Sequence, residues 1–251
     1  YGDHRDLHYP LRRQRQMCIR DRFLGDSFTW GQGLQIPHWL EQGKSIDEIN
    51  ESMPPKVPSE TYDYNSDKIR QIHHFPNLVS KHFNKSYVTK FGNGGSNENI
   101  ISILNNLGEH MDLNGIDFIV IQFTELFRNH QTQERYYDKI NSGVSADAAV
   151  RSIVKEVLHQ VSEEIKNIPA DFKWFGLSWK SEIGNYLKHQ YADNFIPIHY
   201  GEEEFVSFDS IMENHYNLTL GSKYGVHDLH LTSEGHQIIA DSITKKINQY
   251  L

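Results

Sequence analysis

The hydrophobic positions of the chain recur with two periods, one typical of strands and one typical of helices. Short apolar runs predict strands, at residues 87–91, 116–122, 175–179 and 195–198. Amphipathic stretches predict helices, at residues 68–83 with a break at Pro76, 96–107, 145–168 and 233–249. The run at 116–122 is apolar enough to be buried on both faces. Strands that alternate with helices indicate right-handed βαβ crossovers, and therefore a parallel sheet with helices on both faces.

Composition places this pattern in a single domain of ordinary size. The chain has 251 residues, of which 37% are hydrophobic and 12% aromatic, enough to bury a substantial core. A net charge of −8 argues against nucleic acid or an anionic membrane as a partner, and no apolar run reaches the length of a membrane span. The lone Cys18 excludes an intramolecular disulfide and thiolate-rich metal sites, so we predict a cytoplasmic protein.

The first 22 residues differ in composition from the remainder of the chain. They contain six arginines and no lysine, whereas only four of the basic residues after them are arginine. The segment 12–22 resembles translated sequencing-adapter read-through, familiar in metagenomic assemblies. We therefore interpret residues 1–22 as a non-native or disordered tail and residues 23–251 as the domain, with only Phe23 and Leu24 left of the first strand. A basic targeting arm is the alternative; the apolar region of a secretory signal is absent.

Two short motifs, one near each end of the domain, contain a serine, a histidine and a carboxylate. Gly25-Asp26-Ser27-Phe28 follows the first apolar stub, and Asp228-Leu229-His230 comes just ahead of the last predicted helix. A serine hydroxyl is a poor nucleophile at neutral pH, so it needs an imidazole within hydrogen-bond reach and a carboxylate that fixes the imidazole tautomer. The two motifs together therefore indicate a nucleophile and its base.

The predicted topology brings these motifs to one edge of the sheet. In an open parallel sheet, ligands bind beyond the carboxyl ends of the strands. Gly25-Asp26-Ser27 follows the first strand, Gly94-Gly95 follows the second, and Thr124-Glu125 follows the central one. We therefore expect these three loops to converge there, and His230 to meet them.

In this order, the motifs resemble those of the SGNH, or GDSL, hydrolase superfamily over about residues 23–251. Gly25-Asp26-Ser27 matches its first block, Gly95 its second, and Asp228-Leu229-His230 its last. The resemblance implies a flavodoxin-like three-layer α/β/α sandwich with a mainly parallel sheet, and ester hydrolysis through an acyl-serine intermediate without a cofactor. It implies that Ser27 is the nucleophile, His230 the general base and Asp228 its orienting carboxylate. The N–H groups of Ser27 and Gly95 would stabilise the oxyanion.

The chain departs from the family pattern in two places. The third block usually reads Gly-x-Asn-Asp, and its Asn is a third oxyanion donor, whereas the aligned run here is Gln122-Phe123-Thr124-Glu125. The hydroxyl of Thr124 is the remaining side-chain donor at that position, but it is shorter. The family's acid commonly lies three residues before the base, where this chain has His227. Asp228, two residues before the base, is the only carboxylate nearby.

The sequence leaves three functions open. The first is a serine esterase that acts on an ester of a small acyl group, a carbohydrate or a lipid. The second is a catalytically weak or inactive carbohydrate-binding module on the same fold, because the usual Asn donor is missing. The third is acyl transfer to an acceptor other than water. In each case the partner is a small-molecule ester or glycan, we expect Asp26 and Trp30 to contact it, and no histidine and acidic cluster has the spacing of metal ligands.

Overall fold

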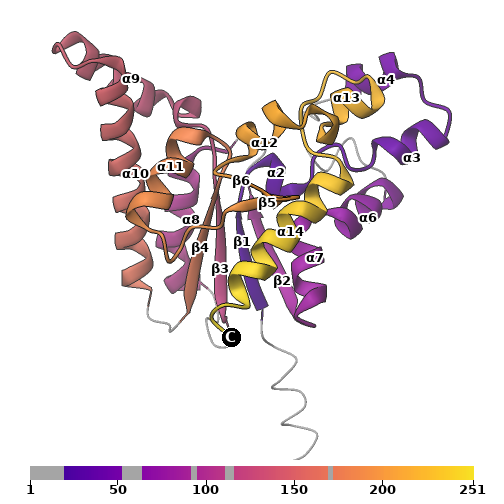
Figure 1. Ribbon diagram of the computed structural model, residues 1–251, viewed down its shortest axis with the longest axis horizontal. Coiled ribbons are helices and arrows are strands. Elements are labelled where there is room, and N and C mark those ends of the chain that lie inside the picture. The colour runs from indigo at the N-terminus through magenta and orange to yellow at the C-terminus, as the bar shows by residue number, and fades with distance from the viewer. Residues whose placement is uncertain (1–19, 53–63, 92–94, 111–115, 169–171) are drawn as a thin grey trace, which may run out of the picture.

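A four-stranded parallel sheet forms the centre of the protein. The computed structural model describes residues 20–52, 64–91, 95–110, 116–168 and 172–251. Within these ranges the strands lie in the order β2-β1-β3-β4, with all neighbouring pairs parallel (Figure 1). Their bounds are β1 (Arg20–Gly25), β2 (Ser86–Phe91), β3 (Phe118–Phe123) and β4 (Lys173–Ser178). The parallel sheet that the sequence predicted is therefore confirmed.

Helices cover both faces of this sheet, as Figure 1 shows. One face carries α6 (Tyr64–His73), α7 (Phe75–His82) and α14 (Ser233–Ile247). The other carries α8 (Asn97–His110), α10 (Ala146–Asn167) and α11 (Ser181–Gln190), and α9 (His130–Asn141) packs against α10. The predicted three-layer α/β/α sandwich, in a single domain, is confirmed.

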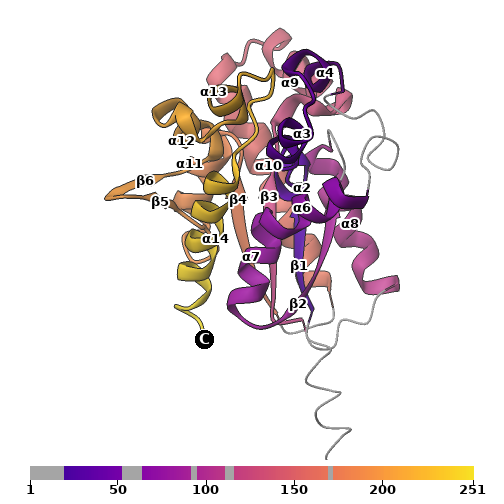
Figure 2. The same cartoon turned by 90° about the vertical axis from the view of Figure 1, so that its right-hand side faces the viewer.

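Shorter elements lie around the carboxyl edge of the sheet, at the top of Figure 1. They are α2 (Ser27–Trp30), α3 (Ile36–Glu41), α4 (Ile46–Ser52), α12 (Phe208–Asn214), α13 (Leu220–Tyr224) and the 3-10 turns η1 (Leu126–Arg128) and η2 (Tyr216–Leu218). A two-stranded antiparallel hairpin, β5 (Ile198–Tyr200) and β6 (Glu203–Phe205), contacts α14 beside the sheet (Figure 2). The loops after the strands therefore have neighbours on several sides, which positions the site described below.

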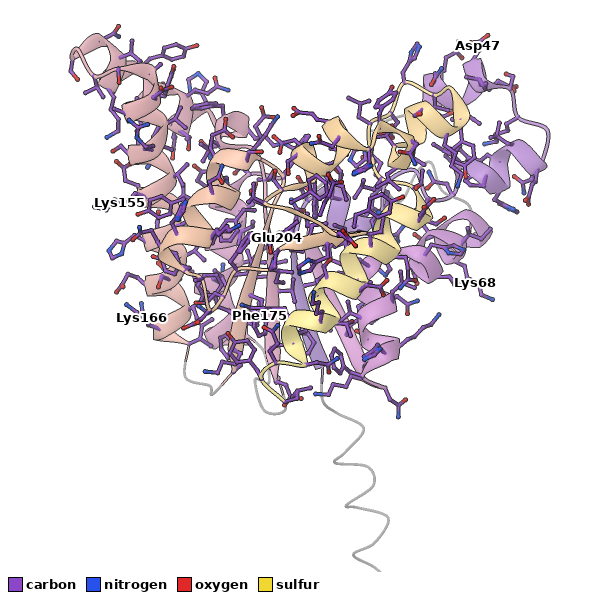
Figure 3. All side chains as sticks on the ribbon, viewed as in Figure 1. Asp47, Lys68, Lys155, Lys166, Phe175 and Glu204 are labelled. Carbon is purple, nitrogen blue, oxygen red and sulfur yellow. The ribbon has the colours of Figure 1, made fainter. Side chains whose placement is uncertain are left out.

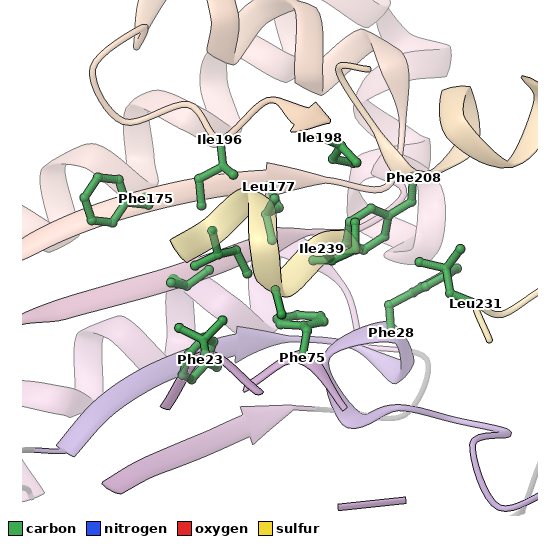
Figure 4. Close-up of a cluster of buried hydrophobic side chains, with 14 of the residues drawn as sticks. Phe23, Phe28, Phe75, Phe175, Leu177, Ile196, Ile198, Phe208, Leu231 and Ile239 are labelled. Carbon is green, nitrogen blue, oxygen red and sulfur yellow. The ribbon is translucent and has the colours of Figure 1, made fainter. Parts of the chain in front are cut away.

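The alternation of side chains along the strands builds the two cores. In β3, Val120 packs into the cluster under α7 and α14, whereas Ile119 and Ile121 pack into the cluster under α8, α10 and α11. Every residue of β3 is buried, as the apolar run predicted. Figure 4 shows the first cluster, in which Phe75 and Ile239 lie among side chains of the strands. Burial of apolar side chains on both faces is what holds the three layers together.

The structure corrects two expectations about strands. The first strand begins at Arg20, so it includes residues 20–22 and is longer than the stub expected from Phe23 and Leu24. Residues 1–19 lie outside the described residues, and their foreign origin stays a prediction. The run 195–198 joins the sheet only at an isolated bridge between Phe195 and Gly176, where the N–H of Ile196 donates to the carbonyl oxygen of Gly176. Pro197 then has no N–H to donate, Ile198 begins β5, and the N–H of His199 donates to Ser242 Oγ of α14.

The outer faces of the helices are polar. Figure 3 shows Lys155 and Lys166 of α10, and Lys68 of α6, extending away from the sheet. The helices in the described part of the chain all lack the combination of length and apolar character that a membrane span requires.

Two histidines, His74 and His236, are buried, and we expect them to make the protein less stable in acid. Burial and the nearby charge of Arg70 lower the pKa of His74 to about 3, and burial also lowers the pKa of His236. Below a histidine's ordinary pKa, these side chains bind protons in the unfolded chain but stay neutral in the folded protein. The free energy of unfolding therefore falls as the pH falls. For His74 alone we expect the free energy of unfolding to drop by about 2 kcal/mol between pH 7 and pH 5.

Urea unfolding of the full chain at both pH values measures this difference. His74→Gln should show a smaller loss in acid, whereas the exposed His159→Gln should behave as the wild type. An unchanged pH dependence in His74→Gln would contradict the assignment.

Candidate active site

Ser27 lies in a tight turn between β1 and α2. Gly25 ends the strand, and a Cβ on it would clash with the hydroxyl of Thr29, so the turn requires glycine here. Asp26 caps the helix, because its Oδ1 accepts the N–H of Phe28 at 3.0 Å. Ser27 is therefore the first residue of α2, held at the carboxyl edge of the sheet.

His230 connects Ser27 to a carboxylate. Ser27 Oγ lies 2.7 Å from His230 Nε2, and His230 Nδ1 lies 2.5 Å from Asp228 Oδ1. The same Oδ1 accepts the backbone N–H of His230 at 2.8 Å, which closes a local turn from Asp228 to His230. This turn explains how an acid only two residues before the histidine can reach its ring. The structure thus places the three predicted side chains in one hydrogen-bonded series.

The surroundings of Asp228 keep it ionised. Burial by itself would raise the pKa of Asp228, but the charge of His230 and the hydrogen bonds to the carboxylate outweigh burial and lower it. One of these bonds comes from Gln32, whose Nε2 donates to Asp228 Oδ2 at 3.3 Å. A carboxylate on Nδ1 favours the tautomer with its proton on Nδ1 and a free Nε2 toward Ser27. Gln32 was missed by the sequence analysis, since no local pattern marks it.

The loop after β3 is tied to the start of α8. Asn97 Oδ1 accepts the N–H of Thr124 at 3.0 Å, and Asn97 Nδ2 donates to the carbonyl oxygen of Thr124 at 3.2 Å. The Thr124 hydroxyl is buried and, among the described residues, has no partner at good hydrogen-bond geometry. The role of Thr124 as a third oxyanion donor therefore stays a prediction.

Asp26 pairs with Arg128, a residue the sequence analysis did not select. Arg128 Nη1 lies 3.1 Å from Asp26 Oδ2 and 3.5 Å from the carbonyl oxygen of Gly95, and its guanidinium stacks 4.4 Å over the ring of Trp179. Burial raises the pKa of Asp26, against the opposing charge of Arg128. Asp26 is only 1% exposed and its carboxylate is bonded to Arg128 and to the N–H of Phe28, so the substrate contact expected of it stays a prediction. Arg128 could have been selected from the sequence by its position shortly after β3, since loops at the carboxyl ends of parallel strands form ligand sites.

The substrate contact expected of Trp30 stays a prediction. Trp30 is buried, and the guanidinium of Arg70 lies 4.5 Å over its ring while donating to its carbonyl oxygen. Trp30 therefore packs against α6 and does not line the cavity next to His230. The aromatic residues in that cavity wall are Phe28, Trp179 and Tyr216.

The cavity has a volume of about 510 Å³ and lies between α12, η2 and the loop that carries His230. Its apolar lining consists of Phe28, Trp179, Met212, Tyr216 and Leu229. Its polar lining consists of Gln32, Lys180, Asp209, Glu213, Thr219, His227, Asp228 and His230. A cavity of this size is typical of small-molecule sites. Among the residues that the structure describes, no three His, Cys, Asp or Glu side chains are grouped as metal ligands would be.

Comparisons with known proteins find similar solved structures, but no protein-family model and no curated protein matches the chain. A protein described as lipolytic, of the G-D-S-L family, from Desulfitobacterium hafniense DCB-2 has a TM-score of 0.43 and 9% identity, covering 91% of this chain and 99% of its own. A lipolytic G-D-S-L family protein from Veillonella parvula DSM 2008 has a TM-score of 0.46 and 11% identity, covering 90% and 96%.

A third structure is a carbohydrate esterase family 2 enzyme with a carbohydrate-binding domain from Corynascus thermopiles (Myceliophthora fergusii). Its TM-score is 0.43 and its identity 13%, over 92% of this chain and 67% of its own. Two of the three proteins carry the family name that the motifs of this chain resemble. With TM-scores of this size, the function of the site has to be argued from its own geometry.

Proposed function

We propose that this protein is a serine ester hydrolase with Ser27 as its nucleophile. The observation that carries the proposal is the series Ser27 Oγ, His230 and Asp228, joined at 2.7 and 2.5 Å. A neutral imidazole at this distance can take the serine proton, and a buried carboxylate stabilises the imidazolium that forms. No other group needs to supply the base.

The reaction proceeds in two halves. Ser27 Oγ attacks the ester carbonyl while its proton passes to His230 Nε2, and the tetrahedral intermediate collapses as His230 returns that proton to the leaving alcohol. Water then attacks the acyl-serine, with His230 again as base, and releases the acid and free Ser27. The same acyl-serine would serve acyl transfer, in which another hydroxyl replaces water.

The developing oxyanion is assigned to two backbone donors. The N–H of Ser27 lies at the first position of α2, where helix geometry leaves it without an intrahelical acceptor. The N–H of Gly95 comes from the loop after β2, and Arg128 contacts the carbonyl oxygen of the same residue. Each such donor typically contributes about 3 kcal/mol to transition-state stabilisation.

The residue at position 124 favours a second candidate, a catalytically weak binding module for a carbohydrate. Thr124 stands where the resembled family has its Asn donor, and its hydroxyl is buried without a hydrogen-bond partner among the described residues, so only backbone donors are assigned to the oxyanion. Loss of one donor typically lowers kcat by about 10²- to 10³-fold. The hydrolase remains the better-supported proposal, because ligand binding alone does not require a hydrogen-bonded serine, histidine and carboxylate.

A fluorophosphonate probe tests the nucleophile directly. We expect the wild-type full chain to be labelled, with the adduct mapped to Ser27 by peptide mass spectrometry, and Ser27→Ala to stay unlabelled. Ser233→Ala, which removes an exposed serine near His230, is the matched control and should be labelled as the wild type. A label that persists in Ser27→Ala would overturn the assignment. Labelling without turnover of any aryl ester would favour the binding module.

A further inference from the structure

We propose that the cavity next to His230 binds an uncharged apolar group of intermediate size, so that the protein prefers neutral medium-chain or aromatic esters to acetates. This inference rests on the proposed function, because it assigns a substrate class to the same site. The apolar group can belong to the acyl part or to the alcohol part of the ester, and the experiment below separates the two. An acetyl group would leave most of the 510 Å³ empty of substrate.

The inner wall of the cavity is aromatic and adjoins the reacting histidine. The ring of Phe28 lies 4.5 Å from that of His230 and 5.0 Å from that of Trp179, measured between ring centroids. Phe28 directly follows Ser27, so the aromatic wall begins one residue from the nucleophile. An apolar group on this wall is therefore held close to both Ser27 and His230.

The mouth of the cavity exposes further apolar surface. Leu229 is 61% exposed and Tyr216 is 54% exposed, and both line the cavity. Leu229 lies between Asp228 and His230, in the turn through which the carboxylate reaches the histidine ring. The turn that holds Asp228 beside His230 therefore also places Leu229 in the wall of the cavity. Exposed apolar side chains around a cavity are typical of ligand sites, since an apolar ligand removes them from water.

The charges at the cavity favour a neutral ligand over an anionic one. Three carboxylates line it, those of Asp209, Glu213 and Asp228, together with one lysine, Lys180. The ammonium of Lys180 lies 3.7 Å from Asp209 Oδ2, so its positive charge is already compensated. The chain as a whole carries a net charge of −8. A substrate with its own carboxylate or phosphate would therefore be repelled.

Two ester series measured with the full chain test the proposal. The first varies the acyl group of p-nitrophenyl esters from acetate through butanoate and octanoate to hexadecanoate, with the hemisuccinate as the anionic member. The second keeps the acetyl group and varies the alcohol from methyl to octyl and benzyl. We expect kcat/KM to rise by about tenfold or more from the shortest to the intermediate member of one series. The series that rises identifies which part of the ester occupies the cavity.

Variants of the lining connect the preference to this cavity. Leu229→Ser removes apolar surface from the cavity and Met212→Trp fills part of its volume. Each should lower the ratio of kcat/KM for the intermediate ester to kcat/KM for the shortest member of the series that rises. Ile46→Ser, which removes an exposed hydrophobic residue outside the cavity, is the matched control and should leave both series unchanged.

The outcomes separate this inference from the proposed function. Fluorophosphonate labelling of Ser27 together with a flat response in both series, a preference for the shortest member in both series, or fast hydrolysis of the hemisuccinate would overturn the inference and leave the hydrolase proposal standing. Absence of labelling and of turnover in a folded wild-type chain would overturn both. A preference that Leu229→Ser and Met212→Trp leave unchanged would place the apolar group elsewhere.

Discussion

Replacing Asp228 with asparagine is expected to lower kcat by about 10⁴-fold while the protein stays folded. Asparagine matches the size of Asp228, and its oxygen can still accept the backbone N–H of His230. It carries no charge to stabilise the imidazolium. If its amide nitrogen faces Nδ1, the ring proton moves to Nε2, which then cannot accept the proton of Ser27. Steady-state kinetics with the best ester of the panel measures the loss.

The control for this prediction is the same substitution at an exposed aspartate away from the site. Asp241→Asn changes an exposed carboxylate on α14 and should keep the wild-type kcat. Circular dichroism and thermal unfolding check that Asp228→Asn is folded. A kcat close to the wild-type value in Asp228→Asn would show that another group orients His230 and would remove Asp228 from the proposed mechanism.

Replacing Arg128 with alanine is expected to destabilise the protein by about 3–5 kcal/mol, because it leaves the buried carboxylate of Asp26 without its charge partner. Burial already raises the pKa of Asp26, and loss of Arg128 raises it further. The folded variant then holds a proton that the unfolded chain releases, so its stability falls as the pH rises toward the folded-state pKa of Asp26. Urea unfolding in mildly acidic and in neutral buffer measures both the loss and its direction with pH.

A double variant separates the charge effect from lost packing on Trp179. In Asp26→Asn/Arg128→Ala no ionised group is buried at this place, so we expect part of the stability to return and the pH dependence to weaken. Arg151→Ala, an exposed arginine on α10, should change stability little. An equal loss in the single and the double variant would show that Arg128 acts through packing alone.

Much of the fold follows from local patterns. The apolar run around β3 predicted a strand buried on both faces, since its side chains had to alternate between two cores. The predicted starts of the helices at 145 and 233 also agree with local chemistry, because the side chains of Ser145 and Thr232 accept N–H groups in the first turns of α10 and α14. The break in the helix over 68–83 was also readable, because a proline fits the first turn of α7 but would interrupt a continuous helix.

Elsewhere a distant contact decided the arrangement. The run 195–198 has the composition of a strand, but it joins the sheet only at the bridge of Phe195 to Gly176, and the N–H of His199 then donates to Ser242 of α14. Trp30 follows Ser27 closely in sequence, yet Arg70 of α6 covers its ring. In both cases the local sequence allowed two arrangements, and a partner far along the chain selected one.

By itself, the sequence determined the layered architecture and the meeting of Ser27 with His230, because the carboxyl ends of parallel strands lie at one edge of the sheet whatever the details of the loops. Only the tertiary structure decided what surrounds them. The bond from Gln32 to Asp228, the pair of Asp26 and Arg128, and the aromatic cavity join residues from loops far apart along the chain. Such pairs leave no periodic signal, since periodicity records which face of an element is buried and not which side chain it meets there.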